Sequence, residues 1–247
     1  MNFTFLHFDT LESTNDEASR QARLGAQEGL CVIARQQTRG RGRYGRQWFS
    51  PMDAGLYFSL ILRPKLTAEK IPLITLMSAV AVHDSLESLY LLECDIKWVN
   101  DILIKDKKIC GILAETVETS LGLAVVVGIG INLTKQSVQP ELSDVATSIE
   151  SETGKKPDKN ALVSSLTANL EKFYLMLLAE KGDEEICKCW TERSSYAFGK
   201  RIKARVSGHT IEGVTKGIDK NGALILRTDL GDVQTITAGE IEQLRQV

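Results

Sequence analysis

The 247-residue sequence lacks the segments that mark export or a membrane span. Its first residues, MNFTFLHFDT, contain no basic stretch followed by an apolar run, so they do not form a secretory signal. No run of about 18 apolar residues occurs anywhere, which excludes a typical transmembrane helix. These absences predict a cytoplasmic protein that does not cross a membrane.

Cysteine and histidine are too few and too scattered to predict a disulfide framework or a metal site. The five cysteines are odd in number and show no framework spacing, which predicts reduced thiols in the cytoplasm. Cys187 and Cys189 lie two positions apart on an expected helix and so do not share a face, which argues against zinc. The three histidines have no common ligand spacing and are expected to be surface or structural residues.

An excess of positive charge is also missing. Lys and Arg total 30 and Asp and Glu total 32, for a formal net charge of -2, whereas nucleic-acid-binding proteins usually carry a basic excess. The P-loop pattern GxxxxGK[ST] does not occur, which excludes the most familiar nucleotide-binding loop. With 43% hydrophobic and 25% charged residues, the composition is that of an ordinary globular protein.

The pattern of apolar residues predicts helices mixed with strands. Apolar residues recur at helical spacing over residues 71–91 and 161–178, and Ser13 is a candidate N-cap for a shorter helix. A turn at residues 105–107 should return Lys108 towards the segment after Trp98. We therefore expect an α+β fold, with a mixed, largely antiparallel sheet backed by helices. The predicted strands cover residues 3–8, 30–34, 55–62, 94–99, 102–104, 108–116 and 121–131.

The final fifty or so residues show a different pattern of apolar and turn-forming residues. After about residue 195 the sequence consists of short alternating runs separated by Gly, Asp and Asn, which is typical of a small all-β module. We therefore expect a larger domain at residues 1–195 and a smaller β domain at residues 196–247.

A loop rich in arginine and glycine carries the strongest chemical signal. Residues 40–46 formally match the dinucleotide pattern GxGxxG, but no helical pattern follows and no acidic residue stands about 20 positions later. Four arginines at 39, 41, 43 and 46 form a cationic patch. The patch is either a solvated basic loop or a clamp for phosphate or carboxylate, since glycine permits close backbone approach and guanidinium groups bind oxygens in pairs.

Such a clamp would suit a reaction that joins a carboxylate to a phosphate. Two unit charges 4 Å apart repel by ~1 kcal/mol in water and by ~4 kcal/mol at an effective dielectric of 20. Fixed cations offset this repulsion and stabilise the charge that develops in the transition state.

Five motifs in order give the sequence a specific resemblance. The segments STN at 13–15, GRGRYGRQW at 40–48, KWVND at 97–101, KICGILAE at 108–115 and GIGINL at 128–133 resemble those of the biotin protein ligases. The resemblance covers about residues 1–195, and the remainder is similar in character to that family's small SH3-like domain. One departure is Val99, which stands where the family usually has proline, so the placement of Asn100 and Asp101 is less constrained.

The resemblance implies an activity and its substrates. It implies a class II synthetase-like catalytic domain that uses ATP and Mg²⁺ to convert biotin to biotinyl-5′-AMP. Biotin would then pass to a lysine of a biotin carboxyl carrier protein. No winged-helix segment precedes the catalytic motifs, so a DNA-binding role is not expected. A homodimer is compatible with the resemblance.

The resemblance also implies site residues, and for three of them a purely structural role is the alternative. Lys108, Arg41 and Arg43 are expected to act in the chemistry, although Lys108 could be a solvated turn lysine. Ser13 could simply cap a helix, and Trp48 could belong to the core. Biotin is expected against Ser13, Thr14, Asn15, Gln37, Arg41, Gly42, Arg43 and Lys108; ATP against Arg43, Arg46, Trp48, Asn100 and Asn132; and Mg²⁺ against Asp101.

Three other functions stay open from the sequence alone. A lipoate or octanoate protein ligase or transferase would share the chemistry, but those proteins generally lack the GRGRxGRxW loop. A nucleic-acid-binding module would use the arginines to grip phosphates, although the net charge counts against it. An inactive biotin sensor would bind biotin without consuming ATP.

Overall fold

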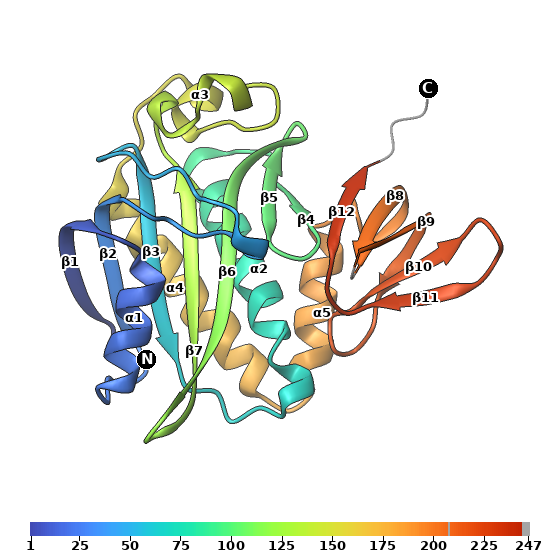
Figure 1. Cartoon of the computed structure of the whole chain (residues 1–247), viewed down its shortest axis with the longest axis horizontal. Coiled ribbons are helices and arrows are strands. Elements are labelled where there is room, and N and C mark those ends of the chain that lie inside the picture. The colour runs from blue at the N-terminus through green and yellow to red at the C-terminus, as the bar shows by residue number, and fades with distance from the viewer. Residues whose placement is uncertain (207, 244–247) are drawn as a thin grey trace.

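Two β-sheets form the frame of the computed structural model, which describes residues 1–206 and 208–243 (Figure 1). The larger sheet has the order β1-β2-β3-β7-β6-β5-β4. Its first pair, β1 with β2, is parallel and every other pair is antiparallel, which confirms the expected mixed, largely antiparallel sheet. The strands are β1 Thr4–Leu11, β2 Leu30–Gln37, β3 Gly55–Leu62, β4 Asp95–Lys97, β5 Asp101–Ile104, β6 Lys107–Thr119 and β7 Gly122–Asn132.

Helices cover both faces of this sheet. Figure 1 shows α1 in front of the strands and α2 and α4 behind them. Ser13 is confirmed as the N-cap of α1, because its side-chain oxygen accepts a hydrogen bond from the Asp16 amide. Among the helices of the part described, none is long and apolar enough to cross a bilayer. The α-helices are α1 Thr14–Arg23, α2 Leu73–Tyr90, α3 Ile149–Thr153, α4 Lys159–Leu178 and α5 Gly182–Glu192.

The alternation of side chains along β7 gives the sheet two different faces. Val127 and Ile129 belong to the large core shared with α2, and they are buried. Gly128 and Gly130 point to the opposite face, which α1 shares. Directly across the ladder, Gly130 pairs with Gly111. The absence of side chains at these neighbouring positions leaves a hollow in the middle of the sheet.

The chain beyond α5 forms a second, five-stranded antiparallel sheet in the order β11-β10-β9-β8-β12. The buried indole of Trp98 donates a hydrogen bond of 3.0 Å to the Gly222 carbonyl of this sheet's β9–β10 turn. A Cβ at Gly222 would lie 2.6 Å from Leu76 of α2, so the two parts are in close contact. The strands are β8 Phe198–Val206, β9 His209–Ile218, β10 Leu224–Thr228, β11 Val233–Ile236 and β12 Glu240–Gln243.

Candidate active site

A cavity of about 470 Å³ lies over the glycine hollow, between α1, the arginine-glycine loop and the start of β12. Every residue predicted for the site from the sequence lines this one cavity. The arginine-glycine loop, residues 40–48, covers it and is called the flap below. The predicted residues thus converge from five separate segments of the chain.

The cavity floor beside α1 is a network of neutral polar groups. The backbone amide and the hydroxyl of Thr14 lie 2.8 and 3.1 Å from Gln37 Oε1 and donate to it. Gln37 Nε2 donates in turn to Ser50 Oγ at 2.9 Å, and Ser50 donates to the Trp48 carbonyl. The floor and the flap are therefore joined by one chain of hydrogen bonds.

Asn15 ties the floor to the central strand β6. Its Nδ2 donates to the Leu113 carbonyl at 3.1 Å and to Glu115 Oε2 at 2.8 Å. A Cβ at Gly128 would lie 2.1 Å from Asn15 Oδ1, so the Asn15 amide occupies space that only glycine leaves open. Asn15 is thus a cross-link between α1, β6 and β7.

Carboxylates neutralise most of the flap arginines. Arg41 binds Glu115 through two hydrogen bonds of 3.0 and 2.7 Å and lies 2.8 Å from Asp16. Arg46 lies 2.6 Å from Glu240 on the second sheet. Arg41 was expected to clamp an anion, but its guanidinium is already held by two carboxylates. Its role in the clamp stays a prediction, and it would require those ion pairs to loosen.

Arg43 has a different environment. Its guanidinium donates to Asn100 Oδ1 at 3.1 Å and to the Tyr44 hydroxyl at 3.0 Å, and both of these partners are neutral. Among the carboxylates of residues 1–206 and 208–241, none forms an ion pair with Arg43. Its full positive charge is therefore available to an anion in the cavity.

Lys108 is a further cation that lines the cavity, and it is paired with a carboxylate. Its Nζ lies 2.7 Å from Asp101 Oδ1, and 5.4 Å from the centre of the Trp48 ring. Lys108 pairs with Leu103 of β5, two residues beyond Asp101, so the pairing of β5 with β6 places the two charges on neighbouring strands. The Lys108 side chain is 32% exposed and lines the cavity, and its role in the chemistry stays a prediction.

Trp48 lies flat against the glycine hollow. A Cβ at Gly130 would be 2.5 Å from its ring, and one at Gly111 would be 3.0 Å away. Its Nε1 is buried and finds no hydrogen-bond partner in the described structure. A buried donor without an acceptor is costly, so this indole is suited to donate to a ligand.

Asn100 and Asn132, the two asparagines expected at the nucleotide, each already donate one hydrogen bond to a backbone carbonyl. Asn100 Nδ2 donates to the Ile112 carbonyl at 3.0 Å. Asn132 is 5% exposed and its Nδ2 donates to the Thr147 carbonyl at 2.9 Å. Their roles in reading a base stay predictions. Val99, the departure from the expected proline, follows Trp98 through a cis peptide bond.

A magnesium ion fits this cavity only if it arrives with phosphate groups. Asp101 offers one hard oxygen donor, and its Oδ1 has no hydrogen-bond partner in the described structure apart from the ion pair with Lys108. Mg²⁺ commonly takes one or two carboxylates and completes its shell with water and substrate phosphates. One carboxylate therefore fits that mode of binding.

Three contributors to the site were not among the predicted site residues. Ser59 and Glu115 lie on strands, on the same face of the sheet as the glycines of the hollow. Strand alternation could have indicated both, because Ser59 pairs with Gly128 and Glu115 is four residues after Gly111. Glu240 approaches the flap from the second sheet, 194 positions away from Arg46 in sequence. No local pattern could have indicated that contact.

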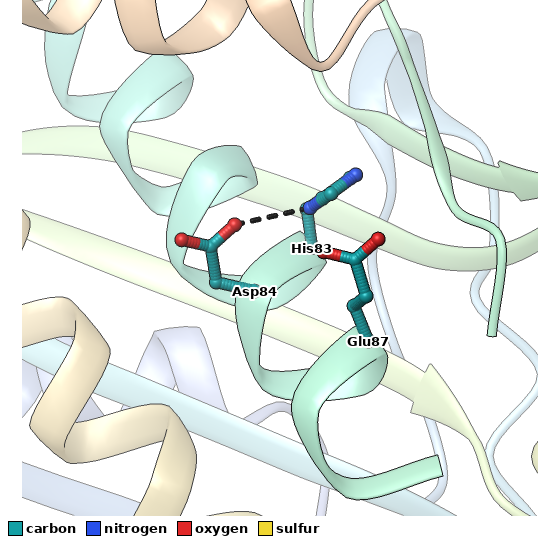
Figure 2. Close-up of side chains that lie close together, drawn as sticks. All are labelled: His83, Asp84 and Glu87. Atoms are coloured by element: carbon teal, nitrogen blue, oxygen red, sulfur yellow. Dashed lines mark hydrogen bonds and ion pairs between the residues drawn. The ribbon is translucent and has the colours of Figure 1, made fainter. Parts of the chain in front are cut away.

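A second cluster of titratable groups lies on α2, outside the cavity (Figure 2). His83 Nδ1 and Asp84 Oδ1 are 3.1 Å apart, with Glu87 one turn further along the helix. Arg193 holds Asp84 through hydrogen bonds of 2.6 and 3.1 Å. Burial opposes ionisation of Asp84, but the bonds from His83 and Arg193 outweigh it and lower the pKa of the carboxyl. Both Asp84 oxygens are therefore engaged by Arg193, and this cluster carries no metal assignment here.

Comparison with known families and relatives gives a consistent result. A family model described as "Biotin/lipoate A/B protein ligase family" matches residues 7–132, and one described as "Biotin protein ligase C terminal domain" matches residues 197–243. The chain is 38% identical to the bifunctional ligase/repressor BirA of Bacillus subtilis over 240 residues, which are 96% of this chain and 73% of that protein. It is 35% identical to the biotin–[acetyl-CoA-carboxylase] ligase of Paracoccus denitrificans, covering 93% of this chain and 96% of that protein.

Solved structures resemble the whole chain. The biotin protein ligase of Aquifex aeolicus in complex with biotin and ATP superposes with a TM-score of 0.85 at 26% identity, covering 98% of this chain and 99% of that one. The Leishmania major enzyme in complex with biotinyl-5-AMP gives a TM-score of 0.65 at 25% identity, covering 96% and 100% of the respective chains.

Proposed function

Because this chain belongs to the biotin/lipoate A/B protein ligase family, with biotin ligases among its relatives, we propose that the cavity activates biotin with ATP and passes it to a lysine of a biotin carboxyl carrier protein. One observation carries this proposal: a single cavity has neutral polar groups on its floor and the cations Arg43 and Lys108 at its rim. The floor suits the ureido ring of biotin, which has one carbonyl acceptor and two N–H donors. The rim suits the carboxylate and the phosphates.

The first step joins two anions. A carboxylate oxygen of biotin attacks the α-phosphorus of ATP, the bond to the bridging oxygen breaks, and pyrophosphate leaves with that electron pair. Arg43, with its uncompensated charge, and Lys108, beside Asp101, stabilise the negative charge that builds up on the α-phosphate. A Mg²⁺ ion, where present, would be held by Asp101 and would neutralise charge on the phosphates.

The second step transfers the biotinyl group. The amine of the acceptor lysine attacks the acyl carbon of the adenylate, the bond to the phosphate oxygen breaks, and AMP leaves while the new amide loses a proton. Between the steps the flap, held by Arg41 and Arg46, excludes water from the adenylate. We assign residues 1–195 to substrate binding and residues 196–247 to a domain that contributes Glu240 to flap closure.

Pyrophosphate exchange tests this function directly. The protein is incubated with ATP, Mg²⁺ and labelled pyrophosphate, with biotin, lipoate or octanoate as the acid. Exchange that requires biotin supports the proposal, whereas exchange with lipoate or octanoate alone would assign the chain to the lipoate branch. Adding a carrier domain and measuring a covalent mass gain then tests the transfer step. A cytoplasmic location, a homodimer and the lack of a DNA-binding role stay predictions.

A further inference from the structure

A fully buried hydroxyl, Ser59 Oγ on β3, lies beneath the cavity floor. It is within hydrogen-bond distance of two floor residues, at 2.8 Å from Thr14 Oγ1 and 2.7 Å from Asn15 Oδ1. Ser59 pairs with Gly128 across the ladder, and the lack of a side chain there is what lets Asn15 reach it. Thus one residue of the central sheet contacts both polar side chains at the start of α1.

The Asn15 amide has no N–H left for a ligand and can only accept a hydrogen bond, through the second lone pair of Oδ1. Both Nδ2 hydrogens are used, one by the Leu113 carbonyl and one by Glu115. Its Oδ1 faces Ser59, the donor that the structure provides for it. Since Oδ1 and Nδ2 are fixed in this way, the orientation of the amide depends on Ser59 as well as on β6.

The hydroxyl hydrogens on the floor can be arranged in two ways, because Ser59 has one hydrogen and two acceptors within reach. If Ser59 donates to Asn15 Oδ1, the Thr14 hydroxyl can donate back to Ser59. If Ser59 donates to Thr14 Oγ1, the Thr14 hydrogen goes to Gln37 Oε1. In both arrangements each hydroxyl hydrogen is used within the network, so the Thr14 and Asn15 oxygens are left with lone pairs that can accept.

We propose that Ser59 is a positioning residue that keeps the Thr14–Asn15 floor a hydrogen-bond acceptor for the N–H groups of the ureido ring. The proposal rests on the proposed function, since it assigns the ureido end of biotin to this floor. Without the Ser59 hydroxyl, Asn15 Oδ1 loses its donor. The amide is then held from its Nδ2 side alone, by Leu113 and Glu115, so its acceptor oxygen is positioned less firmly for the ureido N–H groups.

Ser59→Ala and Ser59→Cys test the proposal by isothermal titration of biotin and by steady-state kinetics. The loss of one buried hydrogen bond should weaken biotin affinity about three- to tenfold. The Cys variant, a weaker donor of similar shape, should fall between wild type and Ala. The KM for ATP and the kcat at saturating biotin should change by less than about twofold, since Ser59 acts only on the acid.

Ser78→Ala is the matched control. Ser78 is also fully buried, but its hydroxyl donates to the Ile74 carbonyl within α2. This variant should lose stability without losing biotin affinity. Unchanged biotin affinity in Ser59→Ala would overturn the proposal. So would an equal loss of affinity for biotin and ATP that follows the fall in Tm and also occurs in Ser78→Ala, because that result indicates general destabilisation.

The titration separates this proposal from the proposed function. Wild-type protein that binds biotin but shows no biotin-dependent exchange would overturn the proposed activity, while the affinities of the Ser59 variants would still decide the role of Ser59. Wild-type protein that does not bind biotin at all would overturn both.

Discussion

The Glu115 carboxylate holds the Arg41 guanidinium through two parallel hydrogen bonds, and the same carboxylate accepts from the Asn15 amide. Glu115 comes from the central strand β6, Arg41 from the flap and Asn15 from α1. One side chain therefore links the cover of the cavity to its floor. In a biotin protein ligase, flap closure protects a reactive mixed anhydride from water, so this link should control leakage of the intermediate.

Glu115→Gln should make the enzyme release or hydrolyse biotinyl adenylate. The amide keeps the shape of the side chain but loses the charge that holds Arg41. The pair is part-exposed, with side chains 40% and 29% accessible, so its contribution is about 1 kcal/mol, or about fivefold in flap opening. Biotin-dependent ATP consumption without an acceptor protein should rise by about that factor. Measuring AMP release in the presence and absence of the carrier domain checks this.

The matched control is Glu118→Gln, which removes an exposed carboxylate three positions along the same strand. It should leave AMP release at the wild-type level. Equal AMP release by the wild type and Glu115→Gln would mean that the two hydrogen bonds between Arg41 and Glu115 do not hold the flap closed.

Lys108→Ala should slow adenylate formation by ~10²-fold or more, by analogy with the loss of a charge-stabilising donor. The Lys108 ammonium lines the cavity and is paired with Asp101, whereas Lys105, three residues earlier in the β5–β6 turn, is 83% exposed and pairs with Glu152. Lys105→Ala is therefore the control and should exchange pyrophosphate at the wild-type rate. Near-wild-type exchange by Lys108→Ala would remove this lysine from the chemistry.

The sequence predicted the main helices and strands, and its candidate site residues line one cavity, but it did not predict the ion pairs of that cavity. Periodicity gave both long helices, and the Ser13 cap followed from local chemistry, because these features depend on neighbours within a few positions. The Arg41–Glu115 fork joins residues 74 positions apart, so it depends on strand register and flap path. For that reason Arg41 and Arg43 looked equivalent in the sequence, although only Arg43 has purely neutral partners among the contacts described.

Gly130→Ala should disturb nucleotide binding through Trp48. An added Cβ would lie 2.5 Å from the indole ring, so the ring and the flap must move away from the hollow. Gly111→Ala is a graded comparison, since its Cβ would lie 3.0 Å from the same ring. The KM for ATP should rise in both variants and more in Gly130→Ala. Equal KM values for wild type and Gly130→Ala would show that the contact between Trp48 and the hollow does not matter for ATP.

The Arg193–Asp84 pair should stabilise the fold in a pH-dependent way. The pKa of Asp84 is lowered in the folded protein, so the pair contributes above the unfolded pKa of about 3.9 and its contribution is lost as the pH falls through the folded value. Arg193→Ala should cost about 2 kcal/mol at pH 7, because a part-buried, charged hydrogen bond is lost. The difference in Tm from wild type should shrink below about pH 4.

A second arginine–aspartate fork provides the control for this effect. Arg201 and Asp229 on the second sheet make the same two-bond contact, at 2.9 and 2.6 Å, but their side chains are 41% and 58% exposed, against 24% and 18% for Arg193 and Asp84. Water and salt screen an exposed pair, so Arg201→Ala should lower the Tm at pH 7 much less than Arg193→Ala does. If both variants lose the same stability at pH 7, then burial does not explain the strength of the Arg193–Asp84 pair.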